Sequence, residues 1–254
     1  MLNIVLPMAG KGSRFAAKGY KLPKPLIDVC GVPMIRVVVD NLCPSCPHRF
    51  IFICQKSHLK EYNLEEHLKR LEPNSVVIGI DGYTEGQLST ALIAKEYIGD
   101  DEELITANTD QFIDGDIDRF LADARSRDLD GSIMTMSGED PKWSYAKIDS
   151  SGLVVEVAEK KVISKFATTG IYYFKKGQFF CKAGEKIIAS DERVNGEFYI
   201  CPCYNVMIAQ GKRIGIYSLE DNNASMFGLG TPVDLTYFLN TNQAARLRHK
   251  YANN

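Results

Sequence analysis

The sequence contains no apolar run that approaches the roughly 18 residues needed for a membrane-spanning helix. It also lacks an excess of one charge, since 30 Lys and Arg face 32 Asp and Glu, whereas proteins that bind nucleic acid are usually strongly basic. The apolar segment Met1–Leu6 has no basic region before it and meets Pro7 at once, unlike a signal peptide. We therefore expect no membrane association and no nucleic-acid partner, and we expect a cytoplasmic enzyme.

Cysteine is infrequent, and its seven positions show no disulfide framework. An odd number of scattered cysteines is typical of reduced thiols in the cytosol. Cys43 and Cys46 have the spacing of half a zinc site, and Cys201 and Cys203 form a second close pair. Neither pair has further Cys or His neighbours at the spacing of a zinc knuckle. We therefore interpret the cysteines as plain thiols rather than as zinc ligands.

The first half of the chain alternates between apolar strands and amphipathic helices. The periodicity predicts strands at 2–6, 50–54, 75–80, 103–107 and 132–136. Between them it predicts helices at 34–41, 57–70 (with Ser57 as the cap), 86–97 and 116–127. This alternation is typical of the α/β class, here a three-layer α/β/α arrangement with a mainly parallel twisted sheet. Ligands of such sheets bind beyond the carboxyl ends of the strands, so the residues after Leu6, Ile80 and Ala107 are candidates.

The second half of the chain has closely spaced strand signals, which favour an inserted antiparallel or mixed sheet. These strands are expected at 145–148, 154–158 and 170–174. Helices at 177–190, 202–210 and 232–247 follow, together with a strand at 213–218. Because no repeat or linker interrupts the sequence, we expect a single domain over 1–254, built from the halves 1–137 and 138–254.

Two loop motifs after the first strand combine glycine, proline and positive charge. In Gly10-Lys11-Gly12-Ser13-Arg14, the glycines allow backbone N–H groups to converge on an anion, and Arg14 adds a fixed cation. The spacing is not that of a P-loop, and Phe15 stands where a dinucleotide-binding loop has its third glycine. Ten residues further on, the flanking prolines of Pro23-Lys24-Pro25 stiffen the loop that carries Lys24. Alone, the glycine motif would more often be an ordinary turn, and an isolated lysine is usually a solvated charge.

Together the two motifs resemble the Gly-x-Gly-x-Arg and Pro-Lys-Pro-Leu signature of the sugar-nucleotide pyrophosphorylases, the nucleotidyltransferases of GT-A-like fold. Further segments resemble this family in the same order, namely 84–92, 108–110, 158–160, 169–172, 195–199 and 230–235. The phrases 19–26, 110–112 and 143–145 are similar to those of the short cytidylyl- and uridylyltransferases of capsule synthesis, which include a phosphoglutamine-specific type. The resemblance implies that 1–137 bind the nucleotide and 138–254 bind the acceptor.

The activity implied by the resemblance is transfer of a nucleoside monophosphate from CTP or UTP to a phosphorylated small molecule, with release of pyrophosphate. The acceptor would be a sugar 1-phosphate or a phosphoglutamine-like compound. In this scheme Arg14 holds the β- and γ-phosphates, Lys24 bridges the α-phosphate and the attacking phosphate, Lys160 holds the acceptor phosphate, and Asp110 holds Mg²⁺. The implied nucleotide-binding residues are Met8, Ala9, Gly10, Gly12, Ser13, Gln87, Ser89, Thr90 and Asn108. The implied acceptor-binding residues are Tyr145, Glu159, Gly170, Glu197 and Tyr199.

The charges of the two substrates explain why such an enzyme needs placed cations. Two unit charges about 4 Å apart repel by roughly 4 kcal/mol at an effective dielectric near 20, and both substrates are polyanions. The attacking phosphate is already ionised near neutral pH, so no general base is required. All four histidines lie outside these motifs, in agreement with that chemistry. Catalysis would therefore rest on positioning and charge stabilisation.

The sequence departs from the family at a metal-binding position. Gly228 stands where long-form members have an Asp that helps to bind the metal. The metal must therefore rely on Asp110 and the phosphates alone, or bind a second carboxylate such as Asp114 or Glu220. Asp234 is better explained as an acidic residue in the first turn of the last helix, where its charge interacts favourably with the helix dipole. The family motif Glu-Lys-Pro is also replaced by Glu159-Lys160-Lys161, which loosens the expectation of an ordinary hexose 1-phosphate.

Most of the proposed site residues also have a purely structural interpretation. Asp110 could cap a loop, Lys160 could be a surface lysine, Ser89 and Thr90 could cap a helix, and Tyr145 could lie in the core. Two other functions remain open at this point. A GT-A glycosyltransferase would use Asn108-Thr109-Asp110 as a degenerate metal motif, and a regulatory subunit would bind the nucleotide without turnover. A homo-oligomer is compatible with the sequence.

Overall fold

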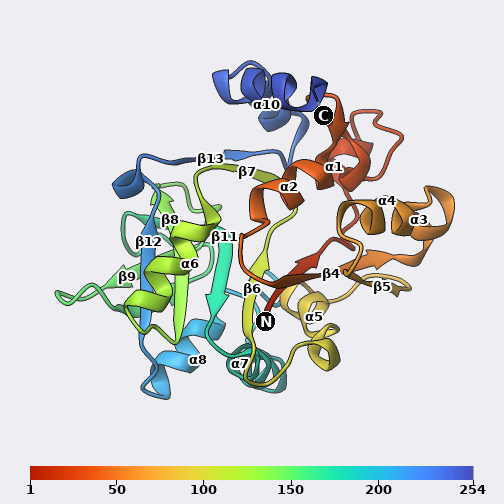
Figure 1. The fold of residues 1–254 in the computed structure, drawn as a ribbon. Helices are drawn as coiled ribbons and strands as arrows, with labels where there is room; N and C mark the ends of the chain where they lie inside the picture. Colours follow the sequence, from red (N-terminus) through yellow and green to blue (C-terminus); the bar gives the residue numbers. More distant parts are fainter. Residues whose placement is uncertain (254) are drawn as a thin grey trace.

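The computed structural model describes residues 1–253, which are arranged around a large twisted sheet (Figure 1). Seven strands follow one another across it in the order β10-β9-β11-β6-β1-β4-β5, and β8 and β12 extend it beside β11. The strands are β1 (Leu2–Pro7), β4 (His48–Gln55), β5 (Val76–Ile80), β6 (Glu103–Ala107), β8 (Gly131–Ser137), β9 (Tyr145–Ile148), β10 (Val154–Ala158), β11 (Phe166–Phe174) and β12 (Ile214–Ser218).

The sheet is parallel in the half that holds the N-terminus and mixed in the other half. Strands β6, β1, β4 and β5 are parallel neighbours, and β12 runs parallel to β8. Strand β11 is antiparallel to β6, β8 and β9, and β9 is antiparallel to β10. The predicted α/β class, with a mainly parallel sheet and an antiparallel insertion, is confirmed. Since β1, β4, β5 and β6 run in one direction, their carboxyl ends share one edge of the sheet.

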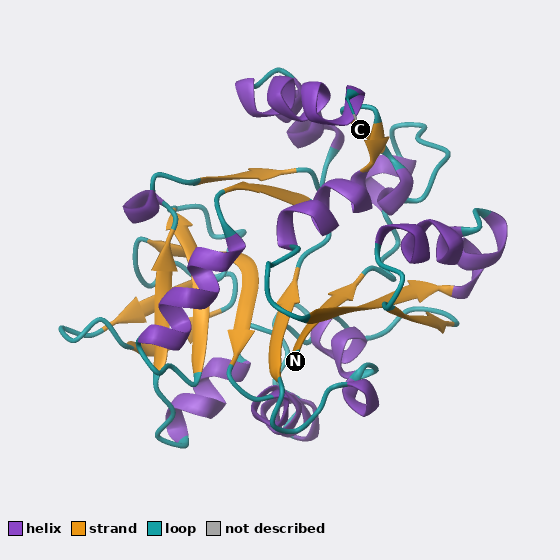
Figure 2. Cartoon of the chain, viewed as in Figure 1, coloured by secondary structure: helices purple, strands orange, loops and turns teal. Residues whose placement is uncertain are grey.

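Helices cover both faces of the sheet, as the alternating side chains of the strands require (Figure 2). Val5 and Ile53 face a core shared with α5, α7 and α8, whereas Ile4 and Phe52 face a core shared with α2, α4 and α6. Figure 1 shows α2 and α4 on one side of β4 and α5 on the other. The helices are α1 (Ser13–Ala16), α2 (Met34–Leu42), α3 (Lys56–Glu61), α4 (Leu64–Leu71), α5 (Gln87–Leu92), α6 (Ile117–Ser126), α7 (Gly177–Ala189), α8 (Cys203–Ala209), α9 (Pro232–Leu239) and α10 (Asn242–Ala252).

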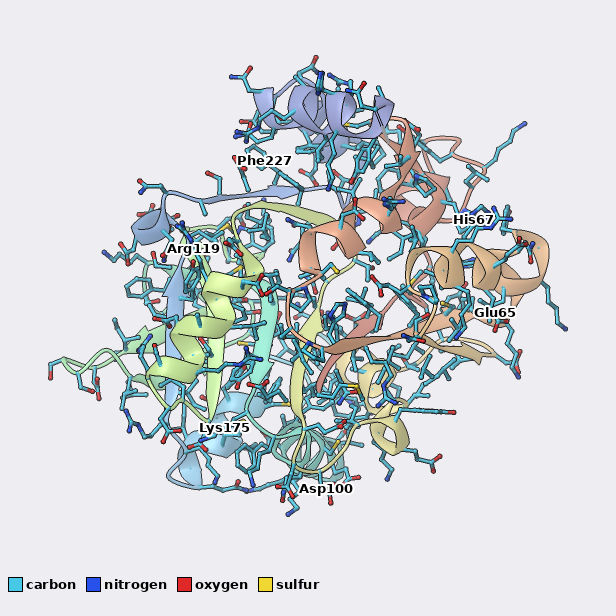
Figure 3. The ribbon with its side chains drawn as sticks, viewed as in Figure 1. Glu65, His67, Asp100, Arg119, Lys175 and Phe227 are labelled. Carbon is cyan, nitrogen blue, oxygen red and sulfur yellow. The ribbon has the colours of Figure 1, made fainter. Side chains whose placement is uncertain are left out.

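Two short strand pairs and the C-terminal helices form a third core that the sequence did not predict. β7 (Gln111–Asp114) pairs with β13 (Ser225–Gly228), and β2 (Asp28–Val29) pairs with β3 (Val32–Pro33). The rings of Phe112, Phe227 and Phe238 lie 5.4–6.4 Å apart and join the β7–β13 ribbon to α9. Figure 3 labels Phe227 on this ribbon, next to the C-terminal helices. The end of the chain thereby packs beside α1 and α2 (Figure 1).

Three predicted helices have different boundaries in the structure. The helix expected at 57–70 is interrupted because Asn63 adopts a left-handed conformation, and Ser57 lies inside α3 rather than capping it. The helix expected at 86–97 ends as α5 at Leu92 and is followed by a separate 3₁₀ turn. The helix expected at 232–247 consists of α9 and α10, with the Thr241 hydroxyl accepting a hydrogen bond from the N–H of Ala244 at the start of the second.

The seven cysteines of the described chain are free thiols. Cys201 and Cys203 are buried in the core shared with α7 and α8, whereas Cys43 is exposed. The two close pairs therefore do not combine into one four-thiol site. None of the helices formed by residues 1–253 is both long enough and apolar enough to cross a lipid bilayer.

Candidate active site

Two adjoining hollows open at the carboxyl edge of the parallel strands. The smaller has a volume of about 440 Å³ and the larger about 920 Å³. Both are lined by the same six residues where they meet, which are Pro7, Arg14, Lys24, Gln87, Glu197 and Gly230. The cleft can therefore hold two molecules whose reacting ends touch at this junction.

The loop after β1 forms one wall of the smaller hollow. Residues 9–15 line it, and Gly12 takes a left-handed conformation with φ of 61°. The side-chain amide of Gln55, at the end of β4, donates hydrogen bonds to the carbonyls of Ala9 and Gly82, each 2.7 Å long. Sequence reasoning missed Gln55, whose position after a buried strand was the available signal. Met8 does not line either hollow, because its side chain is buried and its N–H bonds the carbonyl of Ile53.

The opposite wall of the smaller hollow comes from the start of α5 and the loop before it. Tyr83, Thr84, Gln87 and Thr90 line this wall. The Thr90 hydroxyl bonds the carbonyl of Gly86 at 3.0 Å, so it stabilises the first turn of the helix as well. Tyr83 was not among the predicted contacts, although its exposed ring lies under the amine of Lys11. Ser89 lines neither hollow.

Lys24 and Asp110 meet at the junction of the hollows. The Lys24 Nζ atom lies 2.7 Å from Asp110 Oδ2, and both side chains are about three-quarters buried. Lys24 opens a 3₁₀ turn between its two prolines, and Asp110 follows β6. A Cβ atom on Gly230 would lie 2.5 Å from Asp110 Oδ2, so the missing side chain leaves the space that this carboxylate occupies. The structure therefore brings Arg14, Lys24 and Asp110 into one cleft.

Asn108 and Gly170 connect the two halves of the chain beneath the cleft. The amide of Gln87 donates to Asn108 Oδ1 at 2.6 Å, and the Asn108 N–H bonds the carbonyl of Gly170 at 3.1 Å. Gly170 has φ of 79°, and a Cβ atom there would overlap the Asn108 side chain. The missing side chain of Gly170 is thus needed for this close approach, and Gly170 also lines the larger hollow.

Charged and polar side chains alternate along the far wall of the larger hollow. The amine of Lys160 contacts the hydroxyl of Tyr199 and lies 4.5 Å from the centre of its ring. The Tyr199 hydroxyl donates in turn to Glu197 at 2.7 Å. Burial, together with the bond to Glu197, raises the pKa of Tyr199. Burial also raises the pKa of Glu159, although the hydroxyl of Ser144 and the charge of Lys160 oppose this shift.

Tyr145 does not line either hollow. Its ring is fully buried, and its hydroxyl donates a 2.8 Å hydrogen bond to the carbonyl of Asp140. Trp143, Ser144 and Tyr172 line the larger hollow instead. Tyr145 directly follows Ser144 in an extended segment, and neighbouring residues of such a segment face opposite sides, so Tyr145 points into the core while Ser144 faces the hollow.

The structure changes the choice of a second carboxylate for a metal. Asp114 pairs with Arg246 at 2.7 Å, and Glu220 accepts a hydrogen bond from the N–H of Ser137, so neither lines the cleft. Asp234 lies in the first turn of α9, as expected, but it also lines the larger hollow. A Cβ atom on Gly228 would be 3.8 Å from Asp234 Oδ2. Asp234 thus presents a carboxylate beside the position where the family motif has its Asp.

A family model and curated relatives match most of this chain. The model of the nucleotidyl transferase family matches residues 3–206. Among curated relatives, the bifunctional protein GlmU of Lactobacillus helveticus is 23% identical, and that of Enterococcus faecalis 25%. These matches cover 88% and 87% of this chain but 48% of each relative, so the chain spans about half the length of the curated relatives it matches.

Solved structures share the whole fold. A nucleoside-diphosphate-sugar pyrophosphorylase from Vibrio cholerae superposes with a TM-score of 0.78 at 26% identity, covering 94% of this chain and all of its own. An inositol-1-phosphate CTP transferase from T. maritima has a TM-score of 0.72 at 14% identity, covering 98% and 95%, which shows likeness of fold alone. Because the family model covers most of the sequence, the chain belongs to the nucleotidyl transferase family.

Proposed function

We propose that this protein transfers a nucleoside monophosphate from CTP or UTP to a phosphorylated small molecule and releases pyrophosphate. The observation that carries the proposal is the position of Arg14 and Lys24 at the junction of two adjoining hollows, with Lys160 on the far wall of the larger one. The smaller hollow takes the triphosphate and the base, and the larger hollow takes the acceptor. The acceptor phosphate then attacks the α-phosphorus, and the bond from that phosphorus to the bridging oxygen breaks.

Positive groups lower the barrier by offsetting the repulsion between the two anions. The backbone of 9–13 and the guanidinium of Arg14 bind the departing pyrophosphate. Lys24 contacts the α-phosphate and the attacking phosphate together, and Lys160 holds the acceptor phosphate. Since that phosphate is ionised near neutral pH, no side chain needs to remove a proton from it. The cleft acts by holding the reacting atoms in line.

The donor set of the cleft fits Mg²⁺. Asp110 and Asp234 both line the larger hollow, and carboxylate oxygens are the ligands that this hard cation prefers. When bound, Mg²⁺ would supply charge neutralisation at the phosphate oxygens. Lys24 now pairs with Asp110, and the substrate phosphates would take over Lys24 and free the carboxylate.

The wall of the larger hollow favours an acceptor with hydrogen-bonding groups beyond its phosphate. Glu159 and Glu197 offer acceptor oxygens, and Ser144 and Tyr199 offer hydroxyls. Sugar hydroxyls or the amide and amino groups of a phosphoglutamine-like compound would satisfy them. The Vibrio cholerae structure, described as a sugar-nucleotide pyrophosphorylase, supports the first of these. A product of either kind would be an activated precursor for a capsule or other surface polysaccharide.

Pyrophosphate release tests the proposal directly. CTP, UTP, dTTP and ATP are each incubated with Mg²⁺ and a panel of sugar 1-phosphates and phosphoglutamine. We expect pyrophosphate only where CTP or UTP and an acceptor phosphate are both present, and loss of that signal in Lys24→Ala. No release with any pair would contradict the proposal. Transfer of a sugar from a nucleotide-sugar without pyrophosphate would instead identify a glycosyltransferase.

A further inference from the structure

Cys43, His48 and Glu72 meet at the edge of the sheet opposite the candidate active site. Cys43 directly follows α2, His48 opens β4, and Glu72 directly follows α4. Strand β4 runs from His48 to Gln55, and Gln55 reaches the loop of the smaller hollow. The three side chains therefore lie one strand length away from the cleft, and the proposed nucleotidyl transfer does not use them.

The donor atoms of the three residues lie within 4.8 Å of one another, close enough to be drawn together by one ion. Cys43 Sγ lies 3.5 Å from His48 Nε2 and 3.8 Å from Glu72 Oε1, and His48 Nε2 lies 3.9 Å from Glu72 Oε2. Metal–ligand bonds of about 2.0–2.3 Å at tetrahedral angles require donor atoms roughly 3.3–3.6 Å apart. The two Glu72 distances belong to its two different oxygens, so a rotation of this carboxylate, together with closing of a set whose donor atoms now lie within 4.8 Å of one another, would bring all three residues onto one ion.

The imidazole of His48 is held in the orientation that a ligand needs. Its Nδ1 lies 2.8 Å from the carbonyl oxygen of Cys46, and because a carbonyl can only accept, Nδ1 carries the proton. The lone pair of the neutral ring is then on Nε2, which faces Cys43 and Glu72. Phe50 packs edge-on against the ring at 5.5 Å and restricts its rotation. A backbone bond at the other nitrogen is the usual support of a histidine that binds a metal.

The charge and accessibility of the cluster also suit a divalent cation. Within residues 1–253, no Lys or Arg forms an ion pair with the Glu72 carboxylate. One thiolate and one carboxylate would neutralise two positive charges. His48 and Glu72 line a surface hollow of about 450 Å³, which gives room for water as a further ligand. Cys46 also lines this hollow, but its sulfur accepts a 3.6 Å contact from Arg125.

We propose that Cys43, His48 and Glu72 bind one Zn²⁺ ion, with water in the fourth position. On binding, the Cys43 S–H bond gives way to a Zn–S bond and the proton passes to solvent. The ion joins the end of α2, the start of β4 and the end of α4. The sequence led us to interpret Cys43 as a plain thiol, whereas this proposal joins it with two ligands from other elements.

The test uses the full chain without any tag, after a chelator has removed bound metal ions. Excess Mg²⁺ is then kept present so that the oxygen ligands of the cleft are occupied. Zn²⁺ is titrated in competition with a chromophoric chelator, and Co²⁺ is used to detect thiolate coordination by its charge-transfer absorption. We expect one Zn²⁺ per chain, and a melting temperature that rises with Zn²⁺. Mutation of residues that only hydrogen-bond to metal ligands typically lowers metal affinity about 10–100-fold. Cys43→Ser and His48→Gln, which remove ligands themselves, should each lower the Zn²⁺ affinity about 100-fold or more.

Cys46→Ser is the matched control, and it should bind Zn²⁺ as the unmodified protein does. Circular dichroism shows whether each variant is folded, and Glu72→Gln provides a variant that leaves both Cys43 and His48 intact. Less than one Zn²⁺ per chain, equal affinity in Cys43→Ser, or Co²⁺ binding without thiolate absorption would overturn the proposal. Pyrophosphate release does not enter this test, so the two proposals fail separately.

Discussion

Lys24 combines two properties that make it the most informative single residue of the cleft. It lies where the two hollows meet, and its amine is 2.7 Å from Asp110. The prolines on either side fix the backbone that carries it. A lysine placed in this way can contact two phosphates at once, which a mobile surface lysine cannot do.

Lys24→Met should lower kcat/KM for nucleotidyl transfer by about 10²–10³-fold, or roughly 3–4 kcal/mol, because it removes a cation from the reacting phosphates. The measurement is steady-state pyrophosphate release. Lys21→Met is the control, since Lys21 is exposed and lines neither hollow. Equal activity of the two variants would show that Lys24 does not contact the reacting phosphates.

Asp234 is the residue whose role changes most between sequence and structure. Asp234 lies in the first turn of α9, and its N–H donates a hydrogen bond to the hydroxyl of Thr231, which stabilises the start of this helix. Its carboxylate nevertheless lines the cleft beside Gly228. A first-turn acidic residue can therefore stabilise a helix and line a cleft at the same time.

Asp234→Asn should raise the Mg²⁺ concentration needed for half-maximal activity by about tenfold or more, because one of two carboxylate ligands is lost. Asparagine keeps an oxygen that can accept from Thr231, so α9 should stay intact. Activity is measured against Mg²⁺ concentration for this variant and for Asp114→Asn. A shift in the Asp114 variant alone would assign the second carboxylate to Asp114 instead.

At the scale of elements, the predicted strands agree closely with the structure, whereas helix ends agree less well. The strands expected at 2–6 and 103–107 are present as β1 and β6 with nearly the same bounds. The helix expected at 57–70 breaks at Asn63, a residue type that tolerates the left-handed conformation found there. The periodicity of apolar residues identifies a helix or strand. A single residue in the left-handed conformation inside a helix leaves this periodicity almost unchanged, so the break is not predicted.

Glu103 joins three elements through its carboxylate. It opens β6, accepts hydrogen bonds of 2.9 and 2.6 Å from Arg125 in α6, and accepts one of 2.6 Å from Tyr173 in β11. Burial by itself would raise the pKa of Glu103, but the bonds from Arg125 and Tyr173 outweigh it and lower the pKa. The ionised form is therefore the one that stabilises the fold.

Glu103→Gln should lower the free energy of unfolding by about 1–2 kcal/mol at pH 7, a value reduced for partial exposure of the pair. A carboxyl group whose pKa is lowered in the folded state stabilises the fold at pH values above its ordinary pKa. This stabilisation is lost as the pH falls through the lowered pKa. Urea unfolding between pH 7 and pH 4 should show a constant difference above about pH 5 that shrinks below it. A difference that grows on acidification would contradict this.

At the scale of the whole molecule, the C-terminal helices pack against an N-terminal segment of the chain. Helices α9 and α10 cover the N-terminal segment that carries Phe15 and Met34, and the same core holds Phe238. Asp234 is on α9, and Arg14 and Lys24 are in the N-terminal segment. The third core therefore sets the distance between residues from opposite ends of the sequence.

Phe238→Ala should destabilise the protein by about 3–5 kcal/mol, because the ring is fully buried among Phe112 and Phe227. Tyr237→Ala is the neighbouring control. Its ring is 69% exposed, so the free energy of unfolding should change by less than about 0.5 kcal/mol. Thermal and urea unfolding of both variants measure these changes in the free energy of unfolding. Equal losses would show that the third core contributes little.

The sequence by itself indicated most strands and helices of the main sheet, and that the glycine-rich loop after the first strand, Lys24 and Asp110 lie near one edge of a parallel sheet. These features depend on residues close together in the chain, through apolar periods and turn residues. Tertiary structure alone decided that Tyr145 is buried, that Asp234 faces the cleft, that β7 pairs with β13, and that His48 and Glu72 approach Cys43. Each depends on packing between distant segments, which leaves no local pattern because many partners could satisfy the same apolar or polar side chain.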